Sequence, residues 1–373
     1  SDAADSLASL SGRLGLPIVQ TWGSAGLLDS SDPNSFGYFG THGSRLANFV
    51  IQNSDLVISL GCRLDTKATG SPPSSFAREA TKVVVEIDQA EIEKLSRIGV
   101  GDCLPIQTDV DSFLRQLTGA LPSQWECPSE WRIYTQNLRL KLSQEPFQGQ
   151  PKQGNNPYEI FHEIGESLDD DALVVLDTGL SLPFAMESIP QVKGRRIYHD
   201  FNNTSMGWSI GAAIGISHSY PKRQLVIFAG DGSSTLAMSD LTSLSRLRPG
   251  AKLILLDNQG HGMIQQTQDQ WFDGKYVASS SPASLHFPDW RILAEATGWE
   301  YVDLDGANSK ETIGHVLANG ISTFLHVKID SGWRAQPQVK FGYPIEDQDP
   351  PLPRRKFLSL LKVEPMAVSR ERR

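Results

Sequence analysis

The feature of this chain that most restricts its fold is an apolar run ending in Gly-Asp-Gly-Ser, followed by a helical pattern and a second apolar run. The two runs are Gln224–Ala229 and Lys252–Asp257, and leucines between them recur at the spacing of one helix face. A strand, a helix and a returning strand form one βαβ crossover, which brings the carboxyl ends of both strands to the same sheet edge. We therefore expect Asp231 and Asn258, which follow the two runs, to lie close together.

The rest of the chain also alternates short β-rich runs with helix-length segments. The further runs that we predict as strands are Pro17–Thr21, Asp55–Leu60, Lys82–Asp88, Leu173–Leu176 and Thr323–Ile329. Strands that alternate with helices are typical of parallel sheets in α/β proteins. The chain is therefore predicted to form two doubly wound α/β domains with parallel sheets.

The first segment of the chain has a helical pattern. Leu7, Leu10 and Leu14 fall at helical spacing, and Gly15 is suited to end that helix. A doubly wound domain normally starts with a strand. We therefore expect a Rossmann-like central domain that lacks its first strand.

Proline and glycine mark the expected domain boundaries. We assign residues 1–120 to the central domain, 121–156 to a linker with a helical island at Glu130–Leu142, and 157–332 to the second domain. Residues 333–373 are rich in proline and in charges of both signs. We expect them to form an extended tail that ends in a short helix near Arg354–Leu361.

Composition restricts the partners. Lys and Arg number 34 against 43 Asp and Glu, a net charge of −9, so we expect no nucleic acid partner. No apolar stretch reaches the roughly 18 residues that a transmembrane helix needs, so we expect no membrane partner. The three cysteines form no CxxC pair, and the first residues lack a secretory signal pattern. These observations predict reduced thiols and a cytoplasmic protein.

The polar groups at the shared sheet edge have the chemistry of a magnesium site. Asp231 offers a carboxylate oxygen and Asn258 an amide oxygen. A nearby backbone carbonyl, for which Gly260 is the candidate, offers a third ligand. Phosphate oxygens and water would complete an octahedron around the ion.

Glycines beside Asp231 extend this hypothesis to a phosphate. Gly230 and Gly232 let the backbone approach an anion, and the amides of Gly232 and Ser233 at the start of a helix point toward it. An Asp-Gly pair after a strand is, taken alone, more often only a turn. The strand context and the returning Asn258 favour a magnesium–diphosphate site.

The Gly-Asp-Gly sequence followed at an interval by Asn258 resembles the cofactor motif of the thiamine diphosphate-dependent enzymes. Residues 203–215 resemble the family segment whose bulky apolar residue bends the cofactor. This resemblance implies that Met206 takes that role, and that the carbonyl of Thr204 accepts a hydrogen bond from the cofactor's aminopyrimidine.

Two shorter segments extend the resemblance. The loop 177–181 is similar to the one that reaches the diphosphate, which implies Gly179 and Ser181 as cofactor-binding residues. Met263 lies just beyond the metal-binding Asn, as in acetolactate synthases and their relatives, which implies a further cofactor contact. His261 either faces the reacting centre or has a structural role.

The first half resembles the middle domain of acetolactate synthase-like proteins, which holds FAD or a vestigial form of its site. The segments that carry this resemblance are 39–43, 47–48, 54–56, 61–65, 69–70 and 86–88, and with the second half the likeness extends over residues 1–345. The resemblance implies a flavin site at His42, Gly61, Arg63, Asp65 and Glu86. The alternatives are a solvent-facing His42 and an inherited fold without flavin.

The chain departs from the family pattern in three ways. Leu180 and Ser181 stand where the family's diphosphate loop carries Gln and His. Thr267 stands where authentic acetolactate synthases carry a Trp that shapes the second-substrate site, which leaves a specialised pathway as plausible as branched-chain synthesis. No pyrimidine-binding domain is recognised, and in this family that domain supplies the Glu that activates the cofactor.

No catalytic residue is therefore predicted within this chain. Glu159, Glu163 and Glu166 fall at helical spacing beside apolar residues, which is typical of a solvated helix face. Their context does not match that of the activating Glu.

These observations predict the thiamine diphosphate- and Mg²⁺-binding part of an acetolactate synthase-like carboligase or decarboxylase, a transferase-type enzyme acting on a 2-keto acid such as pyruvate. A pyrimidine-binding domain or subunit is expected upstream or in trans, together with homo-oligomer formation. The alternative is a non-catalytic binding or regulatory homologue that keeps the fold. A flavin or nicotinamide oxidoreductase is disfavoured, because no GxGxxG follows a strand.

Overall fold

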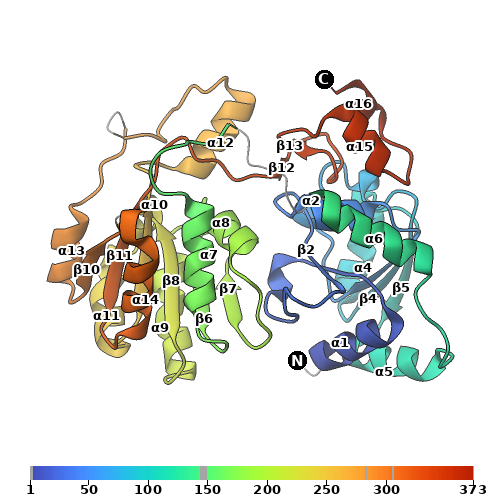
Figure 1. Ribbon diagram of the computed structural model, residues 1–373, viewed down its shortest axis with the longest axis horizontal. Coiled ribbons are helices and arrows are strands. Elements are labelled where there is room, and N and C mark those ends of the chain that lie inside the picture. The colour runs from blue at the N-terminus through green and yellow to red at the C-terminus, as the bar shows by residue number, and fades with distance from the viewer. Residues whose placement is uncertain (1–2, 143–148, 282–283, 305, 373) are drawn as a thin grey trace. The chain divides into compact units, whose positions relative to one another are not determined.

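The structure is a computed structural model that describes residues 3–142, 149–281, 284–304 and 306–372. It contains two compact units (Figure 1). Unit 1 comprises Ser1–Gln148 together with Gln336–Arg373, and unit 2 comprises Gly149–Ala335. Each unit is described by itself below.

Unit 2 is built on a six-stranded parallel sheet with the order β10-β11-β9-β8-β6-β7. The strands are β6 (Leu173–Leu176), β7 (Arg196–His199), β8 (Leu225–Gly230), β9 (Lys252–Asp257), β10 (Glu300–Asp303) and β11 (Thr323–Lys328). Residues of β6, β8 and β9 are almost all buried, as expected for central strands covered on both faces. The predicted parallel α/β sheet is confirmed.

Helices cover both faces of this sheet (Figure 1). The helices of unit 2 are α7 (Pro157–Ser167), α8 (Ser181–Ser188), α9 (Trp208–Ser219), α10 (Asp231–Leu236), α11 (Leu241–Leu247), α12 (Gly262–Trp271), α13 (Trp290–Ala296) and α14 (Ser309–Ala318). Helices α9, α11 and α13 pack on one face through residues such as Ile210, Leu244 and Trp290. On the other face, the ring of Phe161 on α7 lies 4.8 Å from that of Phe228 on β8.

The order of the strands places a topological switch between β6 and β8. After β6 the chain forms β7 on one side, and it then returns to form β8 on the other side of β6. The loops that follow β6 and β8 therefore leave the sheet at adjacent carboxyl ends, where ligands of such sheets bind. Helices α10 and α12 lie at this end of the sheet (Figure 1).

Unit 1 contains two small parallel sheets. The three-stranded sheet is β3 (Leu56–Leu60), β4 (Thr81–Glu86) and β5 (Cys103–Gln107), and the two-stranded sheet is β1 (Ile18–Gln20) and β2 (Ser35–Tyr38). Its helices before the crossing to unit 2 are α1 (Ala3–Leu14), α2 (Arg45–Gln52), α3 (Thr66–Thr69), α4 (Gln89–Ile98), α5 (Val110–Ala120) and α6 (Ser129–Leu142). The predicted helix at the start of the chain is present, and Gly15 follows it with a φ of +66°.

The end of the chain packs into unit 1. It forms β12 (Gln338–Val339), β13 (Gln348–Asp349), α15 (Arg354–Leu360) and α16 (Ala367–Glu371). Phe357 and Leu360 join Phe49 of α2 and Leu138 of α6 in one buried cluster. The predicted tail and the helical island of the predicted linker thus contribute to the core of unit 1, whereas residues 143–148 of that linker lie outside the described residues.

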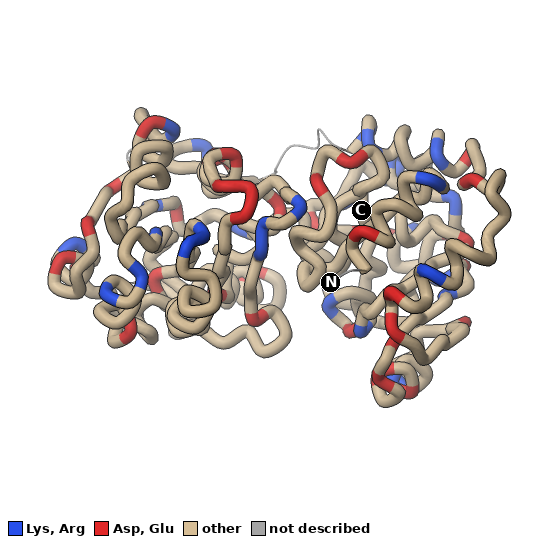
Figure 2. The backbone as a smooth tube through the Cα atoms, turned by 90° about the horizontal axis from the view of Figure 1, so that it is seen from below, with Lys and Arg blue, Asp and Glu red and all other residues tan. Residues whose placement is uncertain are grey.

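Charges of both signs are interspersed along the described parts of both units (Figure 2). In the described residues, no helix combines the length and the apolar character that a membrane span requires.

Candidate functional site

Asp231 is the first residue of α10 and follows β8 directly. Its side chain is buried, and Oδ1 accepts a hydrogen bond of 2.6 Å from the amide of Gly232. Oδ2 accepts one of 3.0 Å from the amide of Gly260, in the loop that follows β9. The structure thus brings together the two loops that the crossover was expected to join.

Asn258 lies in the loop after β9, and the nitrogen of its side-chain amide has no partner in the described part of the chain. It is 6% exposed, and its Nδ2 is buried without a hydrogen-bond partner among the described residues. A Cβ added to Gly262 would lie 2.6 Å from this nitrogen and 2.3 Å from Leu180 Cδ1. Only glycine therefore fits at the start of α12 without moving Asn258 or Leu180.

Two carboxylates approach each other at this point. Burial, followed by the negative charge of Asp257, raises the pKa of Asp231. Burial acts in the same direction on Asp257, but hydrogen bonds from His326 and Gln259 outweigh it and lower the pKa of Asp257. Asp231 has no cationic partner among the described residues, so a bound cation would stabilise its ionised form.

Asp257 is the inner end of a polar chain across three neighbouring strands. His326 on β11 donates from Nε2 to Asp257 Oδ2 over 2.8 Å, and its Nδ1 lies 2.6 Å from the hydroxyl of Tyr301 on β10. Asp257 Oδ1 accepts hydrogen bonds from the backbone and side-chain nitrogens of Gln259, at 3.1 and 2.7 Å. These hydrogen bonds fix the loop that carries Asn258. None of the residues that form them was predicted as a site residue.

Asp177 is a second residue that the sequence analysis did not single out. It is fully buried after β6, and its carboxylate accepts hydrogen bonds from the amides of Thr178, Gly207 and Ser209 at 3.0, 3.1 and 2.8 Å. It therefore fixes the segment that carries Met206. In the sequence, an acidic residue directly after an apolar strand could have identified Asp177.

The segment 204–207 is held in an unusual backbone conformation. Thr204 and Gly207 have φ values of +57° and +83°. Met206, between them, is 38% exposed. A Cβ added to Gly232 would lie 2.9 Å from Met206 Cε and 2.5 Å from His261 Cε1, so both side chains lie over the glycine that follows Asp231.

The remaining predicted cofactor residues surround these loops. Gly179 has a φ of +94°, which favours glycine, and Ser181 is buried with its hydroxyl directed to the carbonyls of Asp177 and Thr178 at 3.2 and 3.3 Å. Ser233 is buried in α10, and Met263 is half-buried on α12. The side chain of Ser181 is thus committed to its own loop.

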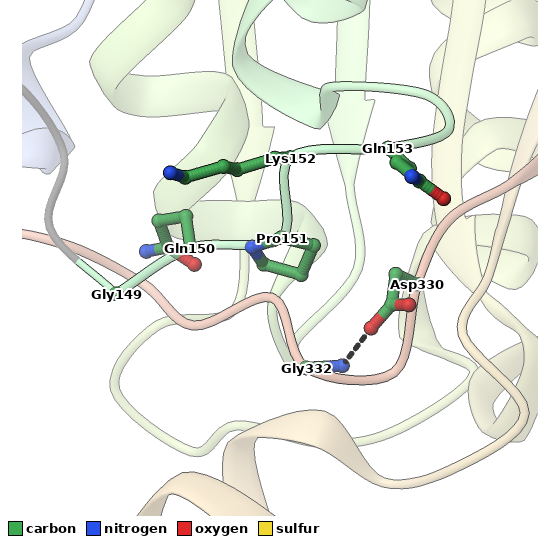
Figure 3. A pocket seen from close by; sticks show the side chains of 7 residues that line it. All are labelled: Gly149, Gln150, Pro151, Lys152, Gln153, Asp330 and Gly332. Atoms are coloured by element: carbon green, nitrogen blue, oxygen red, sulfur yellow. Dashed lines mark hydrogen bonds between the residues drawn. The ribbon is translucent and has the colours of Figure 1, made fainter.

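Helix α12 is anchored by glutamines. Gln266 donates to the carbonyl of Ala335 at 2.9 Å and accepts from the amide of that residue at 2.8 Å, while Gln265 donates to the carbonyl of Ser279 at 2.7 Å. Thr267 is exposed, and its hydroxyl donates to the carbonyl of Met263. A surface hollow lies elsewhere in unit 2, lined by residues 149–153, Asp330 and Gly332, and none of the predicted cofactor residues lines it (Figure 3).

The flavin candidates lie in unit 1, four of them around the carboxyl ends of β3 and β4. Gly61 follows β3 with a φ of +58°. The side chain of Arg63 is 54% exposed and forms an ion pair of 3.1 Å with Glu91. Asp65 caps α3 by accepting hydrogen bonds from two amides, and Glu86 accepts two from the residues that follow it.

His42 is partly buried in the loop between β2 and α2. Burial, together with the positive charge of Lys67, lowers its pKa to about 4. Its Nδ1 lies 3.3 Å from the hydroxyl of Thr41, and its ring is 6.1 Å from that of Trp22. A pKa of about 4 favours the neutral imidazole near pH 7, and the ring packs near Trp22 within unit 1.

The glutamates of α7 lie in unit 2. Glu159 and Glu166 are exposed, and Glu163 accepts a hydrogen bond of 3.0 Å from the hydroxyl of Ser309. This arrangement is that of a solvated helix face.

Two family models match the chain. The thiamine pyrophosphate enzyme central domain matches residues 1–117, and the thiamine pyrophosphate enzyme C-terminal TPP binding domain matches residues 177–327. The fold, the loops around Asp231 and these matches together define a thiamine pyrophosphate-binding protein of the α/β class. The chain belongs to the thiamine pyrophosphate enzyme family, and thiamine pyrophosphate is another name for thiamine diphosphate.

Curated relatives of the chain include acetolactate synthase large subunits. Isozyme 1 of Escherichia coli (strain K12) is 28% identical over 331 residues, which cover 88% of this chain and 56% of the relative. The protein of Parasynechococcus marenigrum (strain WH8102) is 30% identical over 345 residues, 91% of this chain and 54% of the relative. The large subunit of Lactococcus lactis subsp. lactis (strain IL1403) is 25% identical over 328 residues, which cover 88% of this chain and 55% of the relative. The chain spans about half the length of the curated relatives it matches.

Proposed function

We propose that this chain is the thiamine diphosphate- and Mg²⁺-binding part of an acetolactate synthase-like carboligase or decarboxylase that acts on a 2-keto acid such as pyruvate. The observation that carries the proposal is the hydrogen bond between Asp231 and the amide of Gly260, which joins the two loops of the cofactor motif. Beside it, Asn258 Nδ2 has no hydrogen-bond partner among the described residues. The family matches and the acetolactate synthase relatives support the same function.

The residues present fit a magnesium ion and a diphosphate. Asp231 and Asn258 offer oxygen ligands, and the carbonyl of Gly260 is the third candidate. In the described part of the chain, no group of three or more His, Cys, Asp or Glu is placed to hold a metal. A cation held by a single carboxylate needs further oxygens, and phosphate groups would supply them.

Bound thiamine diphosphate would supply the nucleophilic carbon and the electron sink for decarboxylation of a 2-keto acid. The contribution of this chain is to position that group. Asp177 fixes the segment of Met206, and Asp257 fixes the loop of Asn258. We place the activating Glu in a pyrimidine-binding domain, upstream in the same polypeptide or on another subunit.

Apolar side chains around this site support such a partner. Met206 is 38% exposed, and Leu236 at the end of α10 is 67% exposed. Met238, in the short 3-10 helix after α10, is 44% exposed, and Ile264 of α12 is 51% exposed. Exposed apolar groups beside a cofactor site are typical of surfaces that another domain or subunit covers. We therefore propose that the chain works within an oligomer.

The candidate site for FAD binding lies at the carboxyl ends of β3 and β4. Arg63 offers an exposed cationic group there, whereas the carboxylates of Asp65 and Glu86 serve backbone amides. The absorbance spectrum of the protein after incubation with FAD and gel filtration tests this point. Retention of the flavin band by wild type, and its loss in Arg63→Ala, is the result expected of a flavin site.

Calorimetry with thiamine diphosphate tests the main proposal. Wild type should bind the cofactor only with Mg²⁺, and Asp231→Ala should abolish this binding. Asp170→Ala is the matched control, because Asp170 is an exposed acid in the turn before β6. Unchanged affinity in Asp231→Ala would contradict the assignment.

The alternative function is a non-catalytic homologue that keeps the fold. The observation that favours it is the loop after β6, where Leu180 is apolar and the Ser181 hydroxyl is committed to backbone carbonyls. The two functions differ in turnover once a pyrimidine-binding domain is supplied. Carbon dioxide release from pyruvate supports the enzyme, and cofactor binding without release supports the homologue.

A further inference from the structure

The imidazole of His261 makes no hydrogen bond with any described residue, although its backbone is fixed. The amide of His261 donates to the carbonyl of Ser279 over 3.0 Å, and its own carbonyl accepts from the amide of Gln265 over 2.9 Å. The residue precedes α12 and gives that helix no side-chain cap. Its ring nitrogens are therefore available to a ligand.

The ring faces the metal-binding turn. A Cβ added to Gly232 would lie 2.5 Å from Cε1 and 2.6 Å from Nδ1 of His261. Gly232 directly follows Asp231, and His261 directly follows Gly260, so the ring lies between the two loops that the Asp231–Gly260 hydrogen bond joins. Glycine at position 232 leaves the room that the ring occupies.

Two further donors lie beside His261. Asn258 Nδ2 is buried without a partner among the described residues, next to the start of α12. Helix α12 is 10 residues long, and the side chain of its N-cap residue, His261, does not cap its first amides. Uncapped amides at the start of a helix attract anions, and a buried amide donor needs an acceptor.

Several neighbouring donors are committed within the protein. The amides of Gly232 and Gly260 donate to Asp231, and the hydroxyl of Ser181 donates to its own loop. Uncommitted donors for an anion held by a metal at Asp231 are therefore present at Asn258 Nδ2, at the start of α12 and on His261.

We propose that the imidazole of His261 binds the diphosphate of the cofactor, donating a hydrogen bond to a phosphate oxygen, while Asn258 Nδ2 and the first amides of α12 bind other oxygens. The proposal rests on the function proposed above. A neutral imidazole carries one N–H and a protonated one carries two, so either form can donate.

Calorimetry with two probes tests the proposal, thiamine diphosphate and inorganic pyrophosphate, each with Mg²⁺. Hydrogen bonds to charged groups are strong enough that removing this one should weaken binding of both probes about tenfold in His261→Leu. His261→Gln keeps an N–H donor and should recover most of the affinity. His218→Ala is the matched control, because His218 is exposed on α9, and circular dichroism of each variant verifies the fold.

The outcomes separate this proposal from the one on which it rests. If wild type shows no Mg²⁺-dependent binding of thiamine diphosphate, the proposed function itself fails. If wild type binds and His261→Leu keeps its affinity for pyrophosphate, the His261 proposal fails while the proposed function stands. A loss for thiamine diphosphate alone would place the ring against the organic part of the cofactor and would also overturn the proposal.

Discussion

His326 Nε2 lies 2.8 Å from Asp257 Oδ2, and both side chains are 4% exposed. Since an ionised carboxylate can only accept, Nε2 carries the proton and donates it. In the neutral imidazole, Nδ1 is then the acceptor for the hydroxyl of Tyr301 at 2.6 Å. The chain Tyr301–His326–Asp257 therefore has one consistent direction of donation, from the edge strand β10 toward the loop of Asn258.

His326 takes part in both hydrogen bonds and Tyr301 in one, which predicts unequal effects for two substitutions. His326→Leu leaves Oδ2 of the buried Asp257 carboxylate without its donor and should lower the free energy of unfolding by about 2 kcal/mol. Tyr301→Phe removes only the outer donor and should cost about 1 kcal/mol. Urea unfolding of the two variants measures both values. Equal losses, or a larger loss in Tyr301→Phe, would show that the hydrogen bond between His326 and Asp257 contributes little to stability.

Glu187 should make the stability of the folded chain depend on pH. Its Oε1 is buried without a hydrogen-bond partner among the described residues, and burial raises its pKa to about 8. Between the ordinary pKa of a Glu and about 8, the unfolded chain releases this proton while the folded chain keeps it, so stability falls as pH rises through this window.

Urea unfolding at pH 5 and pH 8 measures this effect. From pH 5 to pH 8, wild type should lose on the order of 3 kcal/mol through this group, and Glu187→Gln should not show this loss. Glu166→Gln on the exposed face of α7 is the control and should follow wild type. An identical pH dependence in Glu187→Gln and wild type would show that Glu187 ionises normally in the folded chain.

The central strands were predictable because they are apolar and buried on both faces. The predicted runs Leu173–Leu176 and Lys252–Asp257 coincide with β6 and β9. The edge strands β7 and β10 have mixed composition and partial exposure, so their periodicity was too weak to identify them.

The site was predictable where one crossover joins its residues, and not where contacts are distant in sequence. Asp231 and the loop of Asn258 follow two strands joined by a single crossover. His326 reaches Asp257 from a strand 69 positions later in the chain, and Asp177 accepts from an amide 32 positions later. Only the packed sheet brings these residues together, so the local sequence pattern could not predict these pairs.

Asp177 provides a test of how the segment 204–207 is held. Its carboxylate accepts hydrogen bonds from three amides, and Asp177→Ala should leave the amides of Gly207 and Ser209 without an acceptor. We expect a loss of about 2 kcal/mol in the free energy of unfolding and faster hydrogen exchange at both amides. Unchanged exchange at Gly207 would show that other contacts hold the segment of Met206.

Gly262 and Leu180 provide the last prediction, since they compete for the same space. The Cβ of Gly262→Ala would lie 2.3 Å from Leu180 Cδ1 and 2.6 Å from Asn258 Nδ2, so one of these side chains must move. If Asn258 moves, the affinity for Mg²⁺ and thiamine diphosphate should fall about tenfold, whereas Gly215→Ala, with open space on α9, should leave binding unchanged. Leu180→Ala combined with Gly262→Ala clears one of the two clashes and should recover part of the affinity. Calorimetry of the single and double variants measures this coupling, and purely additive effects would show that Leu180 does not press on the start of α12.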